Sequence, residues 1–400
     1  MTEATKAVAT IDPAKDRKKI LASIVDLMTK EIGPGTLMLL GSKPLELEAW
    51  PTGSLSLDLL LGPGGIPRGK VIEIYGPEGS GKTTLTLSII AQVQRMLGLC
   101  AYIDAEHAVD LDYAKKIGVN VDELLFNQPD YGEQGLTVAA KIIETGHVSL
   151  IVVDSVAALV PKAELEGEIE DNNMALQARM MGKAMRKLKV LASANNCTVI
   201  FINQLREKPG VSFGNPEYTP GGKALKFFSD IRLEIRRGSP IKQGEVQIGN
   251  RAGAKTIKNK VAPPFRKCTF DIIFGEGIDG MQDILSIGVT QGAIEKSGSW
   301  YSANGIRIGQ GEPAAKKWLA ENPDLCTKIE NDLRKTTVID AVVVPNPKAP
   351  KVVKTKAPAP KEPEVKAVST PNEPEPENPK EEPEPIRPVT TPKEETSSDI

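Results

Sequence analysis

A phosphate-binding loop is the part of this chain best suited to chemistry. Glycines in such a loop let backbone N–H groups turn inward around a polyphosphate, and the N-terminus of the following helix adds partial positive charge. The pattern G-x-x-x-x-G-K-[ST] predicts that Lys82 reaches the β- and γ-phosphates of a nucleotide and that the Thr83 hydroxyl binds Mg²⁺. The loop consists of Gly76, Pro77, Glu78, Gly79, Ser80, Gly81, Lys82, Thr83 and Thr84.

The segments on either side of this loop favour phosphate binding over a chance match in a glycine-containing turn. Residues 71–75 form an apolar run typical of a buried strand, and residues 85–96 carry apolar side chains at helical spacing. Strand, loop and helix in this order are the context that the pattern requires. We therefore expect a nucleotide site here.

Two carboxylates follow apolar strands elsewhere in the chain. Asp154 ends the run 150–154, which predicts an acid that holds Mg²⁺ through its water shell, and Glu106 follows the run 100–104. Neighbouring parallel strands end at the same edge of a sheet, so Glu106 can face the γ-phosphate and activate the attacking water. The alternative for each residue is a structural role, namely capping the helix that comes next.

An amide occupies the corresponding place after a third apolar run. Gln204 follows residues 199–203, so it lies at the same predicted sheet edge as the two carboxylates. We expect Gln204 to sense the γ-phosphate and to pass its presence to the loop that comes after it.

These side chains require a scaffold of alternating strands and helices, which the sequence indicates from about residue 45 to 280. Such alternation predicts a mostly parallel sheet with helices on both faces. A further strand is expected at 231–236, and residues 178–194 read as an amphipathic helix with a basic outer face. Residues 281–337 form a compact α-rich segment that ends in helices at 313–320 and 324–335.

The two ends of the chain differ from this central part. Asp12-Pro13 begins a short helix with one apolar stripe, which must pack on the core or on a neighbouring subunit. Beyond residue 340 the composition turns to Pro, Glu, Lys and Thr, which predicts a disordered tail.

The composition limits the classes of function. The formal net charge is −2, so any basic surface for nucleic acid must be local. Four widely spaced cysteines and two histidines give no metal-ligand spacing. No apolar run is long enough to span a bilayer, and no signal peptide is recognisable. We expect a reduced, cytoplasmic protein with no membrane partner.

Several long segments together resemble the bacterial RecA recombinase family from about Leu21 to Lys335. As a set and in order they are far more specific than a single phosphate-binding loop. The matching segments are 76–84, 103–108, 152–159, 161–168, 178–187, 201–204, 213–217, 221–227, 258–260 and 275–278.

The resemblance implies an α/β fold: the mostly parallel central sheet of the P-loop RecA-type ATPase core. It implies an N-terminal helix and strand for subunit packing at 1–44 and the core, with two DNA-binding loops, at 45–280. A small α+β C-terminal domain follows at 281–337, and a disordered tail at 338–400.

The resemblance also implies an activity. Chains of this family use ATP and Mg²⁺ to form helical filaments on single-stranded DNA, pair that strand with homologous double-stranded DNA, and exchange strands in recombinational repair. The filament is also expected to stimulate self-cleavage of a LexA-type repressor in the SOS response.

Roles in the nucleotide site carry over from the family residue by residue. Glu106 becomes the catalytic base, Asp154 the Mg²⁺ acid and Gln204 the switch between γ-phosphate and DNA. Tyr113 stacks on adenine, with Asp110 in the same site, although a helix-surface tyrosine is the plain alternative. Lys258 and Lys260 reach across the subunit interface to a neighbour's ATP, where a solvated charge pair is the alternative.

The DNA-binding loops implied by the resemblance lie at about 166–177 and 205–222. Lysine and arginine would contact phosphates without regard to sequence, and apolar side chains would wedge between bases. Surface loops without a partner are the alternative for both segments. The implied DNA-binding residues are Met174, Arg179, Arg206, Lys208, Phe213, Gly221 and Gly222.

A different P-loop DNA motor, such as a ring helicase on the same core, is the main competing function. It would give no reason for the matches at 213–217 and at Lys258 and Lys260. A small-molecule kinase would need an acceptor pocket and a lid, for which the sequence shows no pattern.

Overall fold

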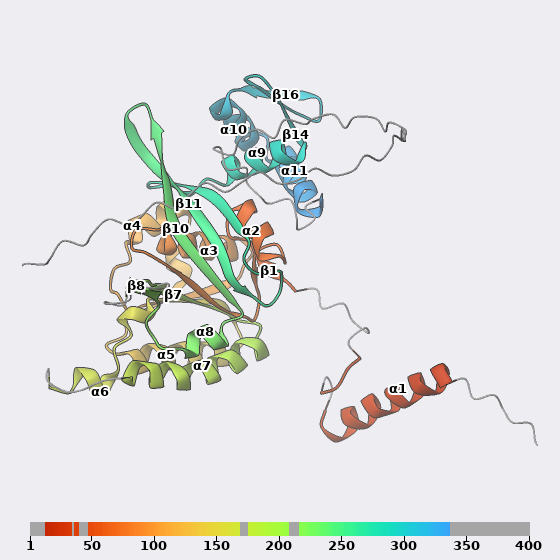
Figure 1. The fold of residues 1–400 in the computed structure, drawn as a ribbon, viewed down its shortest axis with the longest axis vertical. Helices are drawn as coiled ribbons and strands as arrows, with labels where there is room; N and C mark the ends of the chain where they lie inside the picture. Colours follow the sequence, from red (N-terminus) through yellow and green to blue (C-terminus); the bar gives the residue numbers. More distant parts are fainter. Residues whose placement is uncertain (1–12, 34–35, 40–46, 169–174, 208–215, 337–400) are drawn as a thin grey trace, which may run out of the picture. The chain divides into compact units, whose positions relative to one another are not determined.

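A computed structural model of the chain describes residues 13–33, 36–39, 47–168, 175–207 and 216–336 (Figure 1). The predicted tail at 338–400 therefore lies outside the described residues, as do three of the predicted DNA-binding residues: Met174, Lys208 and Phe213. Within the described ranges, no helix combines the length and the apolar character needed to cross a bilayer.

The centre of the described structure is a nine-stranded sheet. Its order is β13-β12-β11-β10-β3-β7-β6-β4-β5, and the pairs from β10 to β5 are parallel while those from β10 to β13 are antiparallel. The predicted mostly parallel sheet is confirmed. The strands are β3 (Val71–Gly76), β4 (Leu99–Asp104), β5 (Leu124–Asn127), β6 (Val148–Asp154), β7 (Thr198–Gln204), β10 (Ile231–Gln243), β11 (Val246–Asn259), β12 (Lys267–Ile273) and β13 (Gly277–Ile278).

Helices cover both faces of this sheet, because successive side chains of each buried strand point to opposite sides. In β7, Ile200 and Ile202 pack with α2, α3 and α4, whereas Val199 and Phe201 pack with α5, α7 and α8. These helices are α2 (Leu55–Leu61), α3 (Lys82–Arg95), α4 (Leu111–Ile117), α5 (Gly132–Glu144), α7 (Leu176–Ala194) and α8 (Ala224–Phe228).

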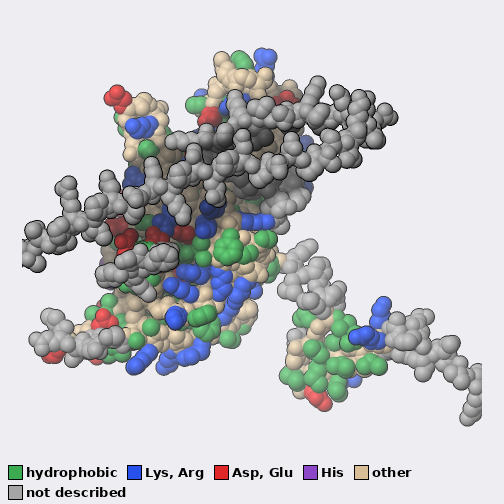
Figure 2. Space-filling model, viewed as in Figure 1, with side chains coloured by type: hydrophobic (Ala, Val, Ile, Leu, Met, Phe, Trp, Pro, Cys, Tyr) green, Lys and Arg blue, Asp and Glu red, His purple; other side chains and the backbone are tan. Residues whose placement is uncertain are grey.

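The predicted amphipathic character of residues 178–194 is confirmed in α7. Met181, Met185 and Leu188 are buried against the sheet, while Lys183 and Arg186 are exposed. Figure 2 shows basic side chains gathered where α7 and α8 lie in Figure 1.

Short elements connect these parts. A two-residue ribbon pairs the segments before and after α2, and a second ribbon closes the predicted second DNA loop. They are α1 (Pro13–Glu31), β1 (Ala49–Trp50), β2 (Ile66–Pro67), the single 3₁₀ turns η1 (Val121–Glu123) and η2 (Val156–Ala158), α6 (Lys162–Leu165), β8 (Arg206–Glu207) and β9 (Glu217–Tyr218).

Residues 280–336 build a separate hydrophobic cluster of helices and strands. Ile284, Ile294, Tyr301 and Leu319 are among its buried members, and Leu55 of α2 joins it. The local sequence indicated an α-rich segment, whereas the family resemblance implied a small α+β domain. The three-stranded antiparallel sheet agrees with the α+β prediction. The elements are α9 (Gly280–Gln291), β14 (Ile294–Ser297), β15 (Trp300–Ala303), β16 (Ile306–Gln310), α10 (Glu312–Glu321) and α11 (Pro323–Thr336).

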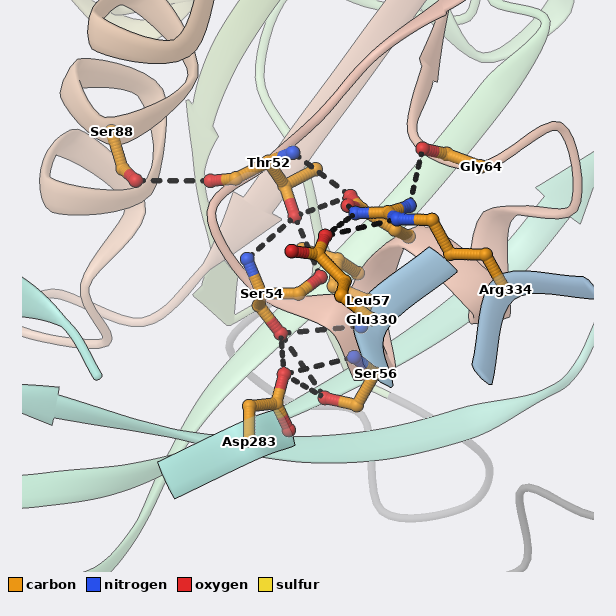
Figure 3. Close-up of polar contacts among 10 residues, drawn as sticks. Thr52, Ser54, Ser56, Leu57, Gly64, Ser88, Asp283, Glu330 and Arg334 are labelled. Carbon is orange, nitrogen blue, oxygen red and sulfur yellow. Dashed lines mark hydrogen bonds and ion pairs between the residues drawn. The ribbon is translucent and has the colours of Figure 1, made fainter. Parts of the chain in front are cut away.

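A buried polar network joins α2 to α9 and α11 (Figure 3). Asp283 of α9 accepts hydrogen bonds from the Ser54 hydroxyl at 2.6 Å and from the Ser56 N–H at 2.8 Å. Asp58 of α2 accepts from the Thr52 hydroxyl at 2.7 Å and pairs with the Arg334 guanidinium of α11 at 2.8 Å. The C-terminal segment is therefore fixed to the central sheet domain by charged groups as well as by apolar contacts.

Candidate nucleotide and DNA site

The phosphate-binding loop lies between β3 and α3, as its pattern predicts. Gly79 and Gly81 have φ values of +66° and +91°, a backbone conformation that glycine adopts without strain. The Lys82 ammonium donates to the carbonyl oxygens of Gly76 at 3.2 Å and Pro77 at 2.7 Å, and burial lowers its pKa. The loop is therefore closed around its own lysine, which is the group expected to meet the phosphates.

A cavity of about 350 Å³ opens in front of this loop. It brings together the side chains that the sequence predicted from four separate segments: Lys82 and Thr83, Glu106, Asp154 and Gln204. Parallel β3, β4, β6 and β7 all end at this edge, which is why residues far apart in the chain converge here.

Asp154 at the end of β6 is bonded to two hydroxyls. The Thr83 hydroxyl donates to its carboxylate at 3.0 Å and the Tyr102 hydroxyl at 2.7 Å. Burial raises the pKa of Asp154 to about 6, although both hydroxyl bonds act in the opposite direction. The carboxylate thus binds the loop threonine, and the helix-capping alternative for it does not apply.

Glu106 faces the same cavity and has two side-chain partners. Gln204 Nε2 donates to it at 2.8 Å, and the Ser155 hydroxyl donates to it as well. The cap of α4 is Asp110, whose carboxylate accepts from the N–H groups of Asp112 and Tyr113. Glu106 is therefore not the helix cap, and it is already in contact with the predicted γ-phosphate sensor.

Tyr113 and Asp110 occupy different places. Tyr113 lines the cavity, and its hydroxyl lies 2.7 Å from that of Thr84. Asp110 is exposed at the start of α4 and is not among the residues that line the cavity. The structure thus brings the predicted adenine-side tyrosine to the phosphate-binding loop but leaves Asp110 in a capping position.

Lys258 and Lys260 lie away from this cavity within one chain. Lys258 pairs in register with Arg232 near the start of β10, whereas the phosphate-binding loop follows the end of β3. The Lys258 ammonium donates to the carbonyl oxygens of Lys226 and Phe227, and Lys260 lies 3.5 Å from Asp230. Any contact of these lysines with ATP must therefore be made with another subunit.

The described ends of the two predicted DNA loops lie next to each other. Arg179, near the start of α7, is exposed, and so is Arg206 in β8. Gly221 is buried with φ +83°, and a Cβ on it would meet Val156 Cγ1 at 2.6 Å. Gly222 has φ +76°, and a Cβ there would meet Ala178 Cβ at 2.7 Å.

The structure also shows polar residues in the site that the sequence analysis did not predict. Tyr102 binds Asp154, Ser155 binds Glu106, and Gln177 and Asn203 bind the backbone around the second loop. Tyr102 could have been suspected, since a tyrosine inside an apolar strand needs a partner for its hydroxyl. Nothing in the local sequence identifies the partners of the two amides.

The fold and the cavity define a P-loop ATPase built on a mostly parallel sheet. Comparison with known proteins makes this assignment more specific. Residues 19–279 match the model of the RecA N-terminal domain, and residues 282–337 match that of the RecA C-terminal domain. The chain belongs to the RecA family.

Curated relatives agree with this assignment. The chain is 52% identical to Protein RecA of Haemophilus ducreyi over 340 residues, which cover 84% of this chain and 91% of that protein. It is 54% identical to Protein RecA of Syntrophus aciditrophicus over 321 residues, which cover 80% of this chain and 94% of the relative. As a member of this family, the chain is a DNA-dependent ATPase that acts as a recombinase in DNA recombination and repair.

Proposed function

We propose that this recombinase hydrolyses ATP with Mg²⁺ in the 350 Å³ cavity and uses the ATP-bound state to hold single-stranded DNA in a filament. The observation that carries this proposal is the convergence of Lys82, Thr83, Glu106, Asp154 and Gln204 on one cavity. These side chains supply phosphate charge compensation, metal ligands, a base and a sensor, as phosphoryl transfer requires.

The residues present fit a magnesium ion. Thr83 and Asp154 offer a hydroxyl and a carboxylate oxygen 3.0 Å apart, and oxygen is the ligand that Mg²⁺ prefers. Bound there, the ion would neutralise charge on the β- and γ-phosphate oxygens. Asp154, a buried carboxylate with a raised pKa, would be stabilised in its ionised form by such a cation.

The chain's own residues divide the remaining work. Lys82 leaves its two backbone carbonyls and binds phosphate oxygens, where its positive charge offsets the charge that develops on the leaving group. Glu106 orients the attacking water and accepts its proton. Gln204 exchanges its bond to Glu106 for the γ-phosphate, so that its position reports whether the triphosphate is intact.

Contacts beyond one subunit complete the proposal. Lys258 and Lys260 approach the neighbour's ATP and act as the positive charges of an arginine finger. The proposal keeps the predicted domain boundaries, at residues 1–44, 45–280, 281–337 and 338–400. The proposed DNA contacts come from seven residues in or next to the two loops: Met174, Lys208 and Phe213, and the described Arg179, Arg206, Gly221 and Gly222. The filament also stimulates self-cleavage of a LexA-type repressor.

The testing experiment is ATP hydrolysis by the purified protein with and without single-stranded DNA. Lys82→Ala and Glu106→Gln are each expected to lower the DNA-stimulated rate by at least about a hundredfold, since each removes a group that acts in the transition state. Glu123→Gln changes an exposed carboxylate in η1 and is the matched control. A Glu106→Gln protein that hydrolyses ATP at the control rate would refute the assigned base.

A further inference from the structure

The C-terminal end of the second DNA loop, residues 220–222, is held by two amide side chains from different elements. Asn203 of β7 donates from Nδ2 to the Pro220 carbonyl at 3.2 Å. The Gly221 N–H donates to Oε1 of Gln177, in the first turn of α7, at 3.1 Å. The single peptide group between Pro220 and Gly221 is thereby fixed at its carbonyl and at its N–H to two separate parts of the core.

Gln177 connects this loop end to the segment that follows Asp154. Its Nε2 donates to the carbonyl oxygens of Val156 at 2.9 Å and Leu159 at 3.2 Å. An amide side chain offers two N–H donors and one carbonyl acceptor, and Gln177 uses both donors and the acceptor here. One side chain therefore links the exit of β6, the start of α7 and the end of the second DNA loop.

Asn203 connects the same loop end to the sensor strand. Its Oδ1 accepts from the Gln204 N–H at 2.9 Å, and its Nδ2 also donates to Oε1 of Glu73 at 3.1 Å. Glu73 is fully buried and binds Arg232 through its other oxygen. Asn203 is therefore fixed on one side by a buried ion pair and is bonded to the backbone of Gln204 on the other.

The packing around the two glycines makes this arrangement stiff. A Cβ on Gly221 would overlap Val156, and a Cβ on Gly222 would overlap Ala178 of α7. Close-packed groups transmit displacements because the interior has few voids to absorb them. A shift of Val156 or of the first turn of α7 must therefore move the loop end.

We propose that Gln177 and Asn203 are positioning residues that couple the occupancy of the nucleotide site to the position of residues 220–222, the C-terminal end of the second DNA loop. When Gln204 turns from Glu106 to the γ-phosphate, its peptide moves with it and acts on Asn203. When Asp154 changes partners, the Val156–Leu159 turn moves and acts on Gln177. Both displacements act on the one peptide group between Pro220 and Gly221, the first at its carbonyl oxygen and the second at its N–H.

The inference rests on the proposed roles of Gln204 and of the second loop, so its test compares two affinities. We would measure binding of a fluorescent oligothymidylate in the presence of ATPγS and in the presence of ADP. The ratio of the two dissociation constants reports the coupling between nucleotide and DNA. Binding of a fluorescent ATP analogue without DNA is measured for each protein in parallel.

Gln177→Met keeps the length of the side chain and removes all of its hydrogen bonds. It is expected to reduce the ratio by about tenfold, equivalent to ~1.4 kcal/mol, while affinity for the ATP analogue stays unchanged. Gln177→Glu keeps an acceptor for the Gly221 N–H but turns its second oxygen toward the carbonyl oxygens of Val156 and Leu159, so the ratio is expected to fall at least as far as for Gln177→Met. Asn195→Ala removes an amide at the opposite end of α7 and is the matched control.

Two outcomes would overturn the inference. The ratio for Gln177→Met could equal that of the control, including the case in which DNA affinity falls by the same factor with both nucleotides. Alternatively, the protein could fail to fold or to bind the ATP analogue, which would assign Gln177 to stability alone. A wild-type protein whose DNA affinity does not depend on the nucleotide would instead contradict the proposed function itself.

Discussion

Replacing Arg334 by methionine would leave a buried carboxylate without its counter-ion. The Arg334 guanidinium donates to Asp58 at 2.8 Å, to the Gly64 carbonyl at 3.2 Å and to Glu330 at 2.7 Å (Figure 3). Asp58 is only 1% exposed, so water cannot replace the lost charge. The variant should destabilise the attachment of α11 to α2, and the size of the effect should depend on pH.

The expected loss in the free energy of unfolding follows from the pKa of Asp58. Burial raises that pKa from 3.8 to about 6, with Arg334 and the Thr52 donors lowering it only in part. At ~1.4 kcal/mol per pKa unit, ionised Asp58 costs ~3 kcal/mol near about pH 7.5 in the wild-type fold. Without Arg334 the pKa of Asp58 in the folded state rises above this pH, so Asp58 takes up a proton. The cost of Asp58 to folding then cannot exceed the free energy of protonating it at this pH, which is ~5 kcal/mol. The electrostatic loss is then ~2 kcal/mol, and the lost hydrogen bonds bring it to ~3 kcal/mol.

Lowering the pH should remove most of this difference. The pKa of Asp58 is higher in the folded state than in the unfolded state. Its contribution to stability is therefore fully present below pH 3.8 and is lost as the pH rises through about 6. Near about pH 5.5 Asp58 is mostly protonated with or without Arg334, and the electrostatic loss falls to a few tenths of a kcal/mol.

Urea unfolding at both pH values, combined with hydrogen exchange of the α11 amides, would measure the effect. Lys335→Met removes the neighbouring exposed cation on the same helix and should change the free energy of unfolding by less than about 0.5 kcal/mol. A loss for Arg334→Met below ~1 kcal/mol near about pH 7.5, or one of equal size at both pH values, would refute the reasoning.

Three further predictions concern single residues of the core. Gly81→Ala puts a Cβ 2.4 Å from Ile272 Cδ1 at φ +91°, so affinity for a fluorescent ATP analogue should fall at least about tenfold; unchanged affinity would contradict this. Tyr102→Phe removes the 2.7 Å bond to Asp154 and should slow DNA-stimulated ATP hydrolysis by about three- to tenfold, with an unaltered rate as the opposing result. Ser54→Ala removes the cap of α2 and one donor to buried Asp283, and its free energy of unfolding in urea should fall by ~1–3 kcal/mol.

The convergence of the candidate site residues on one cavity could be predicted from the sequence because each of these residues belongs to a local pattern. The phosphate-binding loop carries its own motif, and Glu106, Asp154 and Gln204 each follow an apolar strand. One general rule, that parallel strands end at a common edge, was then enough to bring them together. The fold class and the recombinase activity predicted from the sequence are confirmed by the family match.

The extent of β10 could not be predicted in the same way. The strand was expected to end at residue 236, and the chain beyond that point contains Gly238 and Pro240, two residue types that usually interrupt a strand. The structure continues it to Gln243, where it pairs only with β11 and the register shifts between Arg237 and Pro240. A proline is tolerated at such an irregularity, since no ladder hydrogen bond is required from its nitrogen.

The positions of the short strands in the predicted α+β C-terminal domain could not be read from the local sequence, for a different reason. β14, β15 and β16 have four or five residues each and are separated by Gly298 and Gly305, which have positive φ. Runs this short show too few alternations to be told from loops. Their pairing is decided by burial of Ile294, Tyr301 and Ile308 against α9 and α10, which is tertiary information.

The two halves of the site are therefore specified differently. Phosphate binding depends on contiguous residues, whereas the proposed link to DNA depends on Gln177 and Asn203. Apart from the adjacent Gln204 N–H, the partners of these two amides lie 17 to 130 positions away. An amide that serves three backbone groups at once cannot be moved to a neighbouring position without losing all of them. A substitution at Gln177 should consequently leave nucleotide chemistry intact while altering its effect on DNA. Chains that share the phosphate-binding loop can thus differ in how strongly ATP controls their hold on DNA, and that difference would be invisible to any comparison of the loop itself.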